Sequence, residues 1–501
     1  MSTFYWVGGT GNWSDDDNHW ATESGGSPAN GNIPTQTDNV IIDANSGLSG
    51  GGTITIDMSA YMTDFTSSTG HTYFLERSSG GFRIYGSAVF ESGLTFGEDS
   101  YIEVGFWGTG SHTINPNGLV LVGDAAFYGS GTYSLLSDWE GVIEDYTMIY
   151  MYNGTFDAND NNVSTYGFFM VGDSEDVCTV NMGSGTWTLR DWYVGSDEYT
   201  IVNAETSTIS LVDNSEFESG GKTYYNVEAA GSDITITGSA TIGTFSMNPP
   251  YNYLYIEGTA TLTVDQWDVN GADGDRLVIG MEEYESDDSR GSGDVEINLY
   301  SGGTTAIGQS FTGDGGYLAY VVLFPSKTGS PTGSMVAKLY AHSGTFGTSG
   351  VPTGEPLATS RESTYLGYTS LNFPTPVLTE DGTKYVLVLE FTGGDASNYI
   401  YEDVDNTSPT HEGNLSTYNG SWSATAGACW IGFTTYSYAS YNLSKSSGTV
   451  TSNFIDINFC NATGGATWNA INSVDFENNT GWNFLYQPVV NKKYALPPFD
   501  R

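Results

Sequence analysis

The chain has 501 residues, enough for roughly two to four domains, and carries 59 acidic against 14 basic residues, a formal net charge of −45. Charged residues make up 15% of the chain, below the ~25% of ordinary globular proteins, so the imbalance reflects missing Lys and Arg. This argues against a nucleic-acid partner, because phosphate binding needs clustered cations, and against enzymes that act on anionic polysaccharides. A neutral glycan remains a compatible ligand.

Three cysteines, Cys178, Cys429 and Cys460, are far apart and odd in number, so the sequence predicts buried thiols rather than a disulfide framework or a zinc site. The first residues lack the basic and apolar regions of a secretory leader, and no apolar run reaches membrane-span length. We therefore expect a chain that is made inside a cell without ordinary secretion, and no insertion into a membrane.

The opening segment FYWVGGTGNWSDDDNHWA (Phe4–Ala21) combines three tryptophans with three aspartates and a histidine. One interpretation is a cation site with the ligands Asp15, Asp16, Asp17 and His19. Consecutive aspartates cannot all turn toward one ion without a looping backbone, however. The alternative buries the flat rings and leaves the aspartates in solvent. We expect residues 1–50 to form an amino-terminal aromatic cap. The residues expected to pack it are Trp6, Trp13 and Trp20.

Beyond the cap, short runs of period-two alternation are broken by Gly, Asn, Asp and Ser, which predicts an all-β protein. Four runs can be laid on one another at Trp187, Ile209, Ile234 and Tyr255, at spacings of 22, 25 and 21 residues. Such a repeat of strand and turn is typical of a solenoid coil. We expect residues 51–300 to form a β-solenoid of the right-handed β-helix type. An antiparallel sandwich with long hairpins is the alternative.

From about residue 301 to residue 440 the strands become longer and more aliphatic, as in KYVLVLEF (Lys384–Phe391). Proline-bearing connections such as GVPTGEPLATS (Gly350–Ser360) join them. The earlier alternation resumes at YNLSKSSGTVTSNFIDINF (Tyr441–Phe459). We infer a β-sandwich or jelly-roll module, residues 301–440, inserted into the solenoid, whose closing coils follow at residues 441–485.

The last residues, 486–501, lose the alternation and end in an extended Pro497–Pro498 pair. One interpretation is a free disordered tail. The other is a docking tail whose cations and aromatic rings reach an acidic neighbouring subunit. Its cationic residues are Lys492, Lys493 and Arg501.

Two segments resemble a known family. YWVGGTGNWSDDDNHWA near the start and ATGGATWNAINSVDFENNTGWNF (Ala462–Phe484) are similar to the opening and closing coils of a Gly/Thr/Asn-rich β-solenoid family found in virion proteins of tailed viruses and in bacterial surface proteins. The inserted region, with QSFT, GSPTG and PLATS, resembles a jelly-roll module of viral and bacterial surface proteins that is similar to carbohydrate-binding modules. The resemblance implies a structural protein and brings no catalytic residues.

Glycan binding needs an exposed flat ring beside polar groups, because sugar C–H faces stack on rings while hydroxyls form hydrogen bonds. The stretches NYIYEDVDN (Asn398–Asn406) and YNGSW (Tyr418–Trp422) offer such groups late in the module. Ordinary packing of alternating aromatic residues in a sandwich is the alternative. The candidate glycan-binding residues are Tyr399, Tyr401, Glu402, Asp403 and Trp422.

Calcium is the one cofactor that the sequence suggests. The segments DANDNN (Asp157–Asn162) and NGADGD (Asn270–Asp275) alternate oxygen-bearing side chains with small residues, as hard-cation loops do. Turn formation by Asn and Asp is the alternative. The candidate ligands are Asp157, Asn159, Asn270, Asp273 and Asp275. No serine elbow, zinc motif or selected carboxylate pair is found, so no catalytic residue is assigned.

These observations predict a non-enzymatic structural protein on the virion surface of a tailed virus such as a bacteriophage. It would be a capsid spike, turret or decoration, or a tail fibre or receptor-binding protein that contacts host-surface glycans. Its expected partners are other virion proteins and further copies of itself, as a homo-oligomeric trimer or, at a capsid vertex, a pentamer. The alternatives are a bacterial or archaeal cell-surface adhesin and a polysaccharide depolymerase.

Overall fold

A computed structural model describes residues 1–97, 102–196, 198–231, 233–247, 253–272, 277–281, 284–288, 295–313, 317–364, 369–405, 412–426, 429–430, 433–438, 440–475 and 479–485. Nearly all of the regular structure is β, and only 1% is helical. The chain divides into two compact units, Met1–Gly280 with Tyr441–Arg501, and Met281–Ser440. Among the described residues, no helix has both the length and the apolar character needed to cross a membrane.

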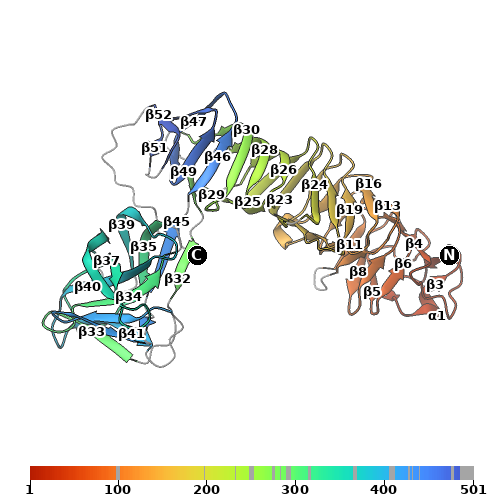
Figure 1. Cartoon of the computed structure of the whole chain (residues 1–501). Coiled ribbons are helices and arrows are strands. Elements are labelled where there is room, and N and C mark those ends of the chain that lie inside the picture. Colours follow the sequence, from red (N-terminus) through yellow and green to blue (C-terminus); the bar gives the residue numbers. More distant parts are fainter. Residues whose placement is uncertain are drawn as a thin grey trace. The chain divides into compact units, whose positions relative to one another are not determined.

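The first unit is a β-solenoid of about 17 turns, in which strands of successive coils pair in parallel (Figure 1). The parallel pairing excludes the antiparallel sandwich for this unit, because hairpins would pair sequential strands antiparallel. One sheet of the solenoid contains β1 (Thr3–Trp6), β4 (Asn39–Asp43), β7 (Phe65–Ser68), β10 (Ala88–Val89), β13 (Ser111–Asn115), β16 (Thr132–Leu135), β19 (Gly154–Asp157), β22 (Cys178–Asn181) and β24 (Thr200–Asn203).

Two further rows of strands complete the coils. The second row begins with β2 (Gly11–Asn12), β5 (Gly52–Ile56), β8 (Tyr73–Arg77) and β11 (Leu94–Phe96), and is followed by β14 (Val120–Leu121), β17 (Trp139–Gly141), β20 (Val163–Ser164), β23 (Thr186–Val194), β25 (Thr208–Glu218), β26 (Thr223–Ala229), β28 (Ala240–Met247) and β30 (Thr261–Val269). The third row contains β6 (Ala60–Met62), β9 (Phe82–Ile84), β12 (Val104–Phe106), β15 (Ala125–Phe127), β18 (Met148–Met151), β21 (Gly167–Met170), β27 (Asp233–Thr237), β29 (Tyr253–Ile256) and β31 (Leu277–Met281). The long strands β23 and β25 bend round a corner and take part in both rows.

The alternation seen in the sequence directs one side of each strand into the coil. In β4, for example, Val40 and Ile42 are fully buried while Ile41 between them is half-buried. Because the coils stack in parallel register, Val40 lies opposite Phe65 of the next coil. Apolar residues therefore stack on apolar residues along the solenoid axis, and the burial of one coil depends on its neighbours.

Glycines allow close approach at one corner of the coils. A Cβ added to Gly129 would lie 2.1 Å from the carbonyl oxygen of Gly108, in the preceding coil. Gly154, one coil later, has a φ of +76° and would bring a Cβ within 2.4 Å of the Gly129 carbonyl oxygen. A larger side chain at this corner would push two coils apart.

The strand register differs in part from the repeat laid out from the sequence. Trp187 does lie opposite Ile209, but Ile209 then lies opposite Val227, which the repeat omitted. Ile234 lies opposite Leu254 rather than Tyr255. The difference of one residue matters, because it moves a side chain from the buried to the exposed side of the strand. Leu254 is accordingly fully buried, whereas Tyr255 faces outward.

The three tryptophans of the opening segment pack together at the amino-terminal end of the solenoid. Trp6, Trp13 and Trp20 are all 0% exposed, and the ring of Trp20 lies 5.1 Å from that of Trp6 and 4.7 Å from that of Trp13. His19, at the end of the short helix α1 (Asp16–His19), stacks on Trp6 at 4.6 Å. β3 (Trp20–Ala21) pairs antiparallel with β1 and covers the edge of the first sheet.

The solenoid continues on the far side of the inserted residues. The strand β46 (Tyr441–Lys445) stacks in parallel on β30, and β48 (Ile455–Ile457) stacks on β31 (Figure 1). β49 (Cys460–Gly464) and β51 (Val474–Asp475) extend the same rows by one coil, and β47 (Thr449–Asn453), β50 (Thr467–Ile471) and β52 (Trp482–Phe484) form a third parallel sheet. The insertion therefore replaces one coil corner without breaking the stack.

The second unit is an antiparallel β-sandwich. Its larger sheet has the order β38 (Val351–Thr359), β37 (Gly333–Ser343), β40 (Lys384–Gly393), β34 (Ala306–Thr312), β42 (Leu415–Tyr418) and β43 (Trp422–Thr425). The opposite layer contains two sheets, one made of β32 (Tyr284–Asp288), β45 (Phe433–Tyr438), β35 (Tyr317–Leu323) and β39 (Thr369–Leu378), the other of β33 (Val295–Leu299), β41 (Tyr399–Asp405) and β36 (Ser326–Thr328), with β44 (Cys429–Trp430) beside β41.

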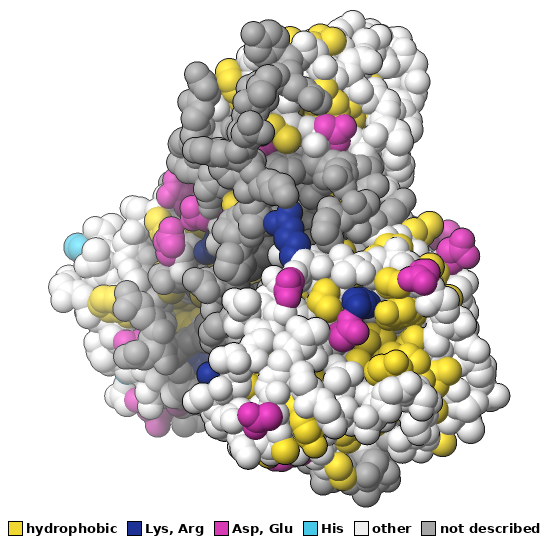
Figure 2. Space-filling view, turned by 90° about the vertical axis from the view of Figure 1, so that its left-hand side faces the viewer, with side chains coloured by type: hydrophobic (Ala, Val, Ile, Leu, Met, Phe, Trp, Pro, Cys, Tyr) yellow, Lys and Arg dark blue, Asp and Glu magenta, His cyan; other side chains and the backbone are white. Residues whose placement is uncertain are grey.

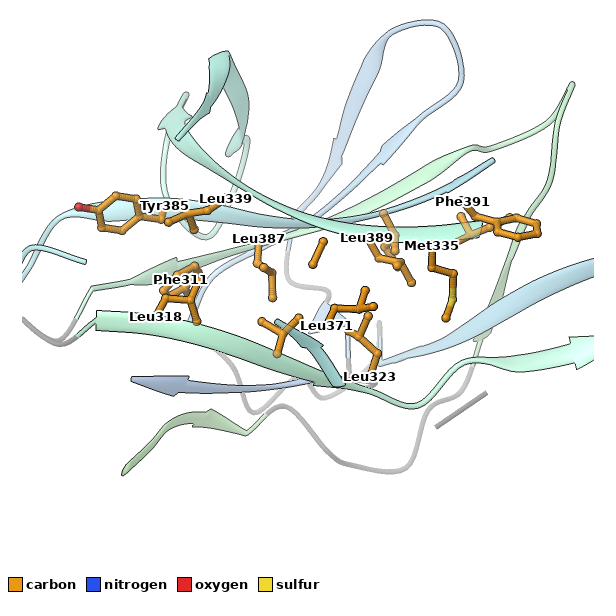
Figure 3. Packing of buried hydrophobic residues seen from close by; sticks show 14 of the residues in the cluster. Phe311, Leu318, Leu323, Met335, Leu339, Leu371, Tyr385, Leu387, Leu389 and Phe391 are labelled. Carbon is orange, nitrogen blue, oxygen red and sulfur yellow. The ribbon is translucent and has the colours of Figure 1, made fainter. Parts of the chain in front are cut away.

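The core of the sandwich lies between these layers. Figure 3 shows Leu387 and Leu389 of β40 pointing toward Leu371 of β39 and Leu323 of β35. All four side chains are at most 1% exposed.

Two strands that were predicted to belong to the solenoid, β32 and β33, pair with β45 and β41 of the sandwich. The boundary between the solenoid and the sandwich therefore lies at Gly280, before the expected boundary at residue 300.

Candidate functional site

The predicted glycan-binding residues of β41 alternate between the two sides of the strand. Tyr399 and Tyr401 are half-buried and Asp403 is exposed, all on the outward side. Glu402 lies between them on the inward side, 1% exposed, next to Ile400 of the sandwich core. A glycan on the outer surface cannot reach this carboxylate, so the structure removes Glu402 from the predicted set.

The structure also separates Trp422 from the two tyrosines. Tyr399 contacts Tyr401 and Tyr300, with ring centroids 6.5 and 6.3 Å apart. Trp422 belongs to β43, at the edge of the six-stranded sheet in the opposite layer of the sandwich. The two segments follow each other in the sequence, but antiparallel pairing with distant strands places them on different layers.

Trp422 instead forms a cluster on the outer side of the six-stranded sheet. Its ring lies 5.3 Å from that of Tyr418, its cross-strand partner in the β42–β43 hairpin. Both rings, together with Tyr340 of β37, pack against a small apolar floor. The floor residues are Ala306, Val386 and Val388.

This outer side is the concave side of a curled sheet. The edge strands β38 and β43 approach each other, which a flat sheet of six strands does not allow. At one end of the sheet, the side chain of Asn414, just before β42, is joined to the backbone of Gly350, just before β38. It accepts a hydrogen bond from Gly350 N and donates one to Gly350 O, each 2.9 Å long. Curling also explains why Val386 is 0% exposed although it points away from the main core. We call Tyr340, Tyr418 and Trp422 with their floor the concave aromatic cluster.

An ion pair and a further lysine lie beside the concave aromatic cluster. Lys384, on the same side of β40 as Val386 and Val388, lies over the ring of Phe346 at 4.4 Å. Lys338 of β37 pairs with Glu390 of β40, on the same side of the sheet as Tyr340. Burial raises the pKa of the Tyr340 phenol; Lys338 opposes this effect, and Glu390 and Glu355 add to it, so the hydroxyl stays protonated and can donate a hydrogen bond. Half-buried rings beside fixed hydrogen-bonding groups suit an uncharged, hydroxyl-rich ligand.

One face of the molecule has a similar character. Figure 2 shows that hydrophobic patches and single carboxylates are interspersed with few Lys or Arg on the described part of this face. Such a surface offers little to a polyanion.

Two members of the concave aromatic cluster were not among the predicted residues. Tyr418 was quoted in YNGSW, and its hairpin position opposite Trp422 could have been inferred from the NG turn. Tyr340 lies in SMVAKLYA, where alternation places it with Lys338 and opposite to Leu339. No local signal indicates that β37 and β43 share one side of a sheet, because the two strands are joined through β40, β34 and β42.

The first calcium candidate is held by turn and inter-coil hydrogen bonds. Asp157 accepts a hydrogen bond from Asn159 N at 3.0 Å and another from Ser134 Oγ, in the preceding coil, at 2.9 Å. Asn159 donates its amide to Leu135 O and has a φ of +49°. These contacts are those of an Asx turn that joins two coils.

The second calcium candidate is described only in part. Asn270 Oδ1 accepts hydrogen bonds from Asn453, and Asn270 donates to Asp268. Asp273 and Asp275 lie outside the described residues, as do the tail residues Lys492, Lys493 and Arg501. Within the described part of the chain, no group of three His, Cys, Asp or Glu side chains is placed to hold a metal ion.

Comparison with known proteins gives little more than a distant structural likeness. No protein-family model and no curated protein matches the sequence. Among solved structures, the chain is similar to the crystal structure of the enzymatically active domain of tailspike protein 4 of bacteriophage CBA120, with 9% identity and a TM-score of 0.23. The match covers 72% of this chain and 63% of that chain, less than two thirds of its length. At this level the likeness assigns neither a substrate nor an activity to the present chain.

Proposed function

We propose that this chain is a structural protein displayed on the surface of a tailed-virus particle, where the solenoid serves as a rigid spacer and the inserted sandwich binds a neutral glycan of the host surface. The observation that supports binding most directly is the concave aromatic cluster. It combines three half-buried rings, an apolar floor and one compensated ion pair on the concave side of a sheet. The display role rests on the sequence resemblance and on the solenoid that carries the module.

A neutral ligand follows from the charges. The two lysines on this side of the sheet already have partners among the described residues: Lys338 pairs with Glu390, and Lys384 donates to Thr312 and lies over the ring of Phe346. This favours an uncharged ligand over a carboxylate or sulfate. The phenol of Tyr340 and the indole of Trp422 supply donors and ring faces, which are the groups that pyranose hydroxyls and C–H faces need. Association with other virion proteins and with further copies of the chain, as a trimer or pentamer, belongs to the same proposal.

Binding by the module is tested on the full-length protein. Wild type and Trp422→Ala are compared on an array of neutral oligosaccharides, with Tyr399→Ala as the matched control because Tyr399 is a half-buried ring on the opposite layer. We expect Trp422→Ala to weaken binding about tenfold or more and Tyr399→Ala to leave it unchanged. Equal binding by wild type and Trp422→Ala would contradict the assignment of the site.

A further inference from the structure

A second aromatic surface runs along the solenoid, remote in sequence from the module. Outward-facing rings on the third row of strands follow one another along the coils. Most of them are stacked, but Tyr150 and Tyr152 come from the same coil, and Tyr150 and Phe169 are tilted by 35°. The distances between ring centroids are 4.4 Å for Trp107 and Tyr128, 5.0 Å for Tyr128 and Tyr152, 6.0 Å for Tyr152 and Tyr150, 5.5 Å for Tyr150 and Phe169, and 5.7 Å for Phe169 and Tyr193. We call these six residues the aromatic column.

The sheet that begins with β1 differs from the side that carries the column. On the sheet that begins with β1, the outward positions in the same coils are small and polar, for example Thr113, Ser134 and Thr179. Tyr152 and Tyr193, by contrast, are each 37% exposed, and Val171 beside them is 52% exposed. A continuous exposed apolar strip on one side of a protein usually marks a binding surface.

The cations near the column are already engaged by rings. Arg83 lies over Tyr61 at 5.5 Å and over Trp107 at 5.3 Å, which extends the stack by one further coil. Arg190 lies over Tyr166 at 5.2 Å in the same way. These guanidinium groups stabilise the stack through cation–π contacts and are covered on their faces.

Carboxylates and phenols line the column on one side. The Tyr128 hydroxyl donates a hydrogen bond of 3.0 Å to Glu103, and Asp124 accepts one of 3.0 Å from Met148 N. Burial, with Glu103 adding to it, raises the pKa of the Tyr152 phenol, so that this hydroxyl stays protonated. The surface beside the rings thus offers phenol hydroxyls and the Glu103 carboxylate to a ligand, whereas Asp124 is 6% exposed.

The column ends at Tyr193, where the next coil contributes no ring. The register partner of Tyr193 is Glu218, and Asp191 lies two residues earlier opposite Glu216. Inside the column each ring covers its neighbour, so a ligand meets mainly the rims there. At Tyr193 no ring follows in register on the next coil, and its ring, 37% exposed, borders the outward carboxylates Glu216 and Glu218.

We propose that the aromatic column is a binding surface for an extended neutral polysaccharide that lies along the solenoid axis, with one sugar ring stacked on Tyr193. The charges around the column favour a neutral polysaccharide over an anionic ligand. A nucleic acid or an anionic glycan would meet Glu103, Glu216 and Glu218, while the nearby guanidinium groups of Arg83 and Arg190 are each engaged by an aromatic ring. A second copy pairing through the same surface would bring these carboxylates together with their counterparts.

The spacing of the column suits such a ligand. Neighbouring strands of a sheet lie ~4.8 Å apart, so each coil advances by a distance close to the length of one sugar ring in an extended chain. A polysaccharide along the axis can therefore repeat the same hydrogen bonds with successive coils. A short oligosaccharide would use only a few of them, and we expect affinity to rise with chain length.

The test uses the full-length protein and affinity electrophoresis in gels that contain dextran, mannan, galactomannan or hydroxyethyl cellulose, with alginate as the anionic comparison. The variant Tyr152→Ala/Tyr193→Ala removes the two most exposed rings of the column. The matched control is Tyr225→Ala, a tyrosine of β26 that is 48% exposed and lies outside the column. A second variant, Tyr152→Leu/Tyr193→Leu, keeps apolar bulk and serves if the alanine variant does not fold.

We expect at least one neutral polysaccharide, and not alginate, to retard wild type and Tyr225→Ala, and both double variants to bind it about tenfold more weakly or worse. Retardation of wild type by none of the neutral polymers, or equal retardation of the folded double variants, would overturn the proposal. So would a changed molecular mass of the double variants in sedimentation with unchanged glycan binding, because the column would then join copies of the chain.

The same gels separate this surface from the site in the module. If Trp422→Ala alone abolishes retardation, the column is not the binding surface and the function proposed for the module stands. If the column variants alone abolish it, the module site fails and the column is supported.

Discussion

Asn270 and Asn453, 183 residues apart in the sequence, join the coils on either side of the insertion: Asn270 Oδ1 accepts hydrogen bonds from Asn453 N at 3.0 Å and from Asn453 Nδ2 at 3.3 Å. Asn270 precedes β31, and Asn453 closes β47 in the next coil. The contact shows that the solenoid closes on itself across the inserted residues.

Removal of the insertion is the first prediction. In the preceding coil the equivalent corner, between β29 and β30, is the short turn Glu257–Ala260, closed by a hydrogen bond from Ala260 N to Glu257 O of 3.1 Å. We expect a chain in which Glu-Gly-Thr-Ala replaces residues 282–440 to fold as a solenoid, because the coils stack through β30–β46 and β31–β48. A cooperative thermal transition with β-type circular dichroism would support this, and an unfolded or aggregated product would contradict it.

The amino-terminal cap should be costly to disrupt. Trp6 is 0% exposed, stacks on His19 and donates its indole N–H to Gly9 O at 2.8 Å. We expect Trp6→Ala to lower the free energy of unfolding by about 3–5 kcal/mol, because it leaves a cavity between three rings. Chemical denaturation measures the change, with Thr3→Ala on the outward side of β1 as the control. A loss no greater than that of the control would show that the cap does not stabilise the solenoid.

The corner glycines give a steric prediction. A Cβ at position 129 would clash with the Gly108 carbonyl oxygen, which is backbone and cannot rotate away. We expect Gly129→Ala to destabilise the protein by more than about 1 kcal/mol. Gly70→Ala is a useful comparison, because Gly70 has a φ of +70° but open space around it, so backbone strain acts there without a clash. Equal effects at the two positions would argue against the close approach of the coils.

Asp191 should make stability fall as the pH rises. Burial, and then the facing carboxylate of Glu216, raise the pKa of Asp191 above its ordinary value. The folded state therefore holds this proton more tightly than the unfolded state, and unfolding becomes easier as the pH rises between the two pKa values. We expect Asp191→Asn to stabilise the protein at neutral pH, by on the order of 0.5 kcal/mol, and to have no such effect in acid below the ordinary Asp pKa.

Glu91 should behave with the opposite sign. Burial alone would raise the pKa of this carboxyl, but hydrogen bonds from Ser67 Oγ, Thr69 N and Gly70 N outweigh it and hold the pKa below the ordinary value. The Glu91 carboxylate therefore stabilises the fold at pH values above its pKa in the unfolded chain. This stabilisation is lost as the pH falls through its pKa in the folded protein. We expect Glu91→Gln to cost about 1–3 kcal/mol at neutral pH and progressively less in acid. Parallel pH profiles for Glu91→Gln and Asp191→Asn would contradict at least one of the two assignments, and the sign of the common profile would show which.

The local features of the fold follow from the sequence, while its long-range pairings do not. Alternation in runs such as NVIID fixes which side of a strand is buried, and the resumption of that pattern at Tyr441 reveals the insertion. Register is different, because a shift of one residue exchanges Leu254 for Tyr255, and both residue types are found in buried strand positions. The sequence alone therefore does not determine the register of the solenoid strands.

The candidate sites show the same limit. Glu402 could have been placed inside by counting alternate positions from Ile400, since both lie on the same side of β41. The meeting of Trp422 with Tyr340 could not, because it depends on the order of six antiparallel strands. The aromatic column did leave a signal: an aromatic residue directly precedes a corner glycine in Tyr85-Gly86, Trp107-Gly108 and Tyr128-Gly129, once in each coil.

The most direct test of the proposed role is cryo-electron microscopy of particles from the producing source, with the protein located by a specific antibody label. Display on a virion predicts label at defined, symmetry-related positions, at capsid vertices or on the tail. Particles without label, with the protein instead on cell envelopes or free in the medium, would contradict the virion role and favour a cell-surface adhesin.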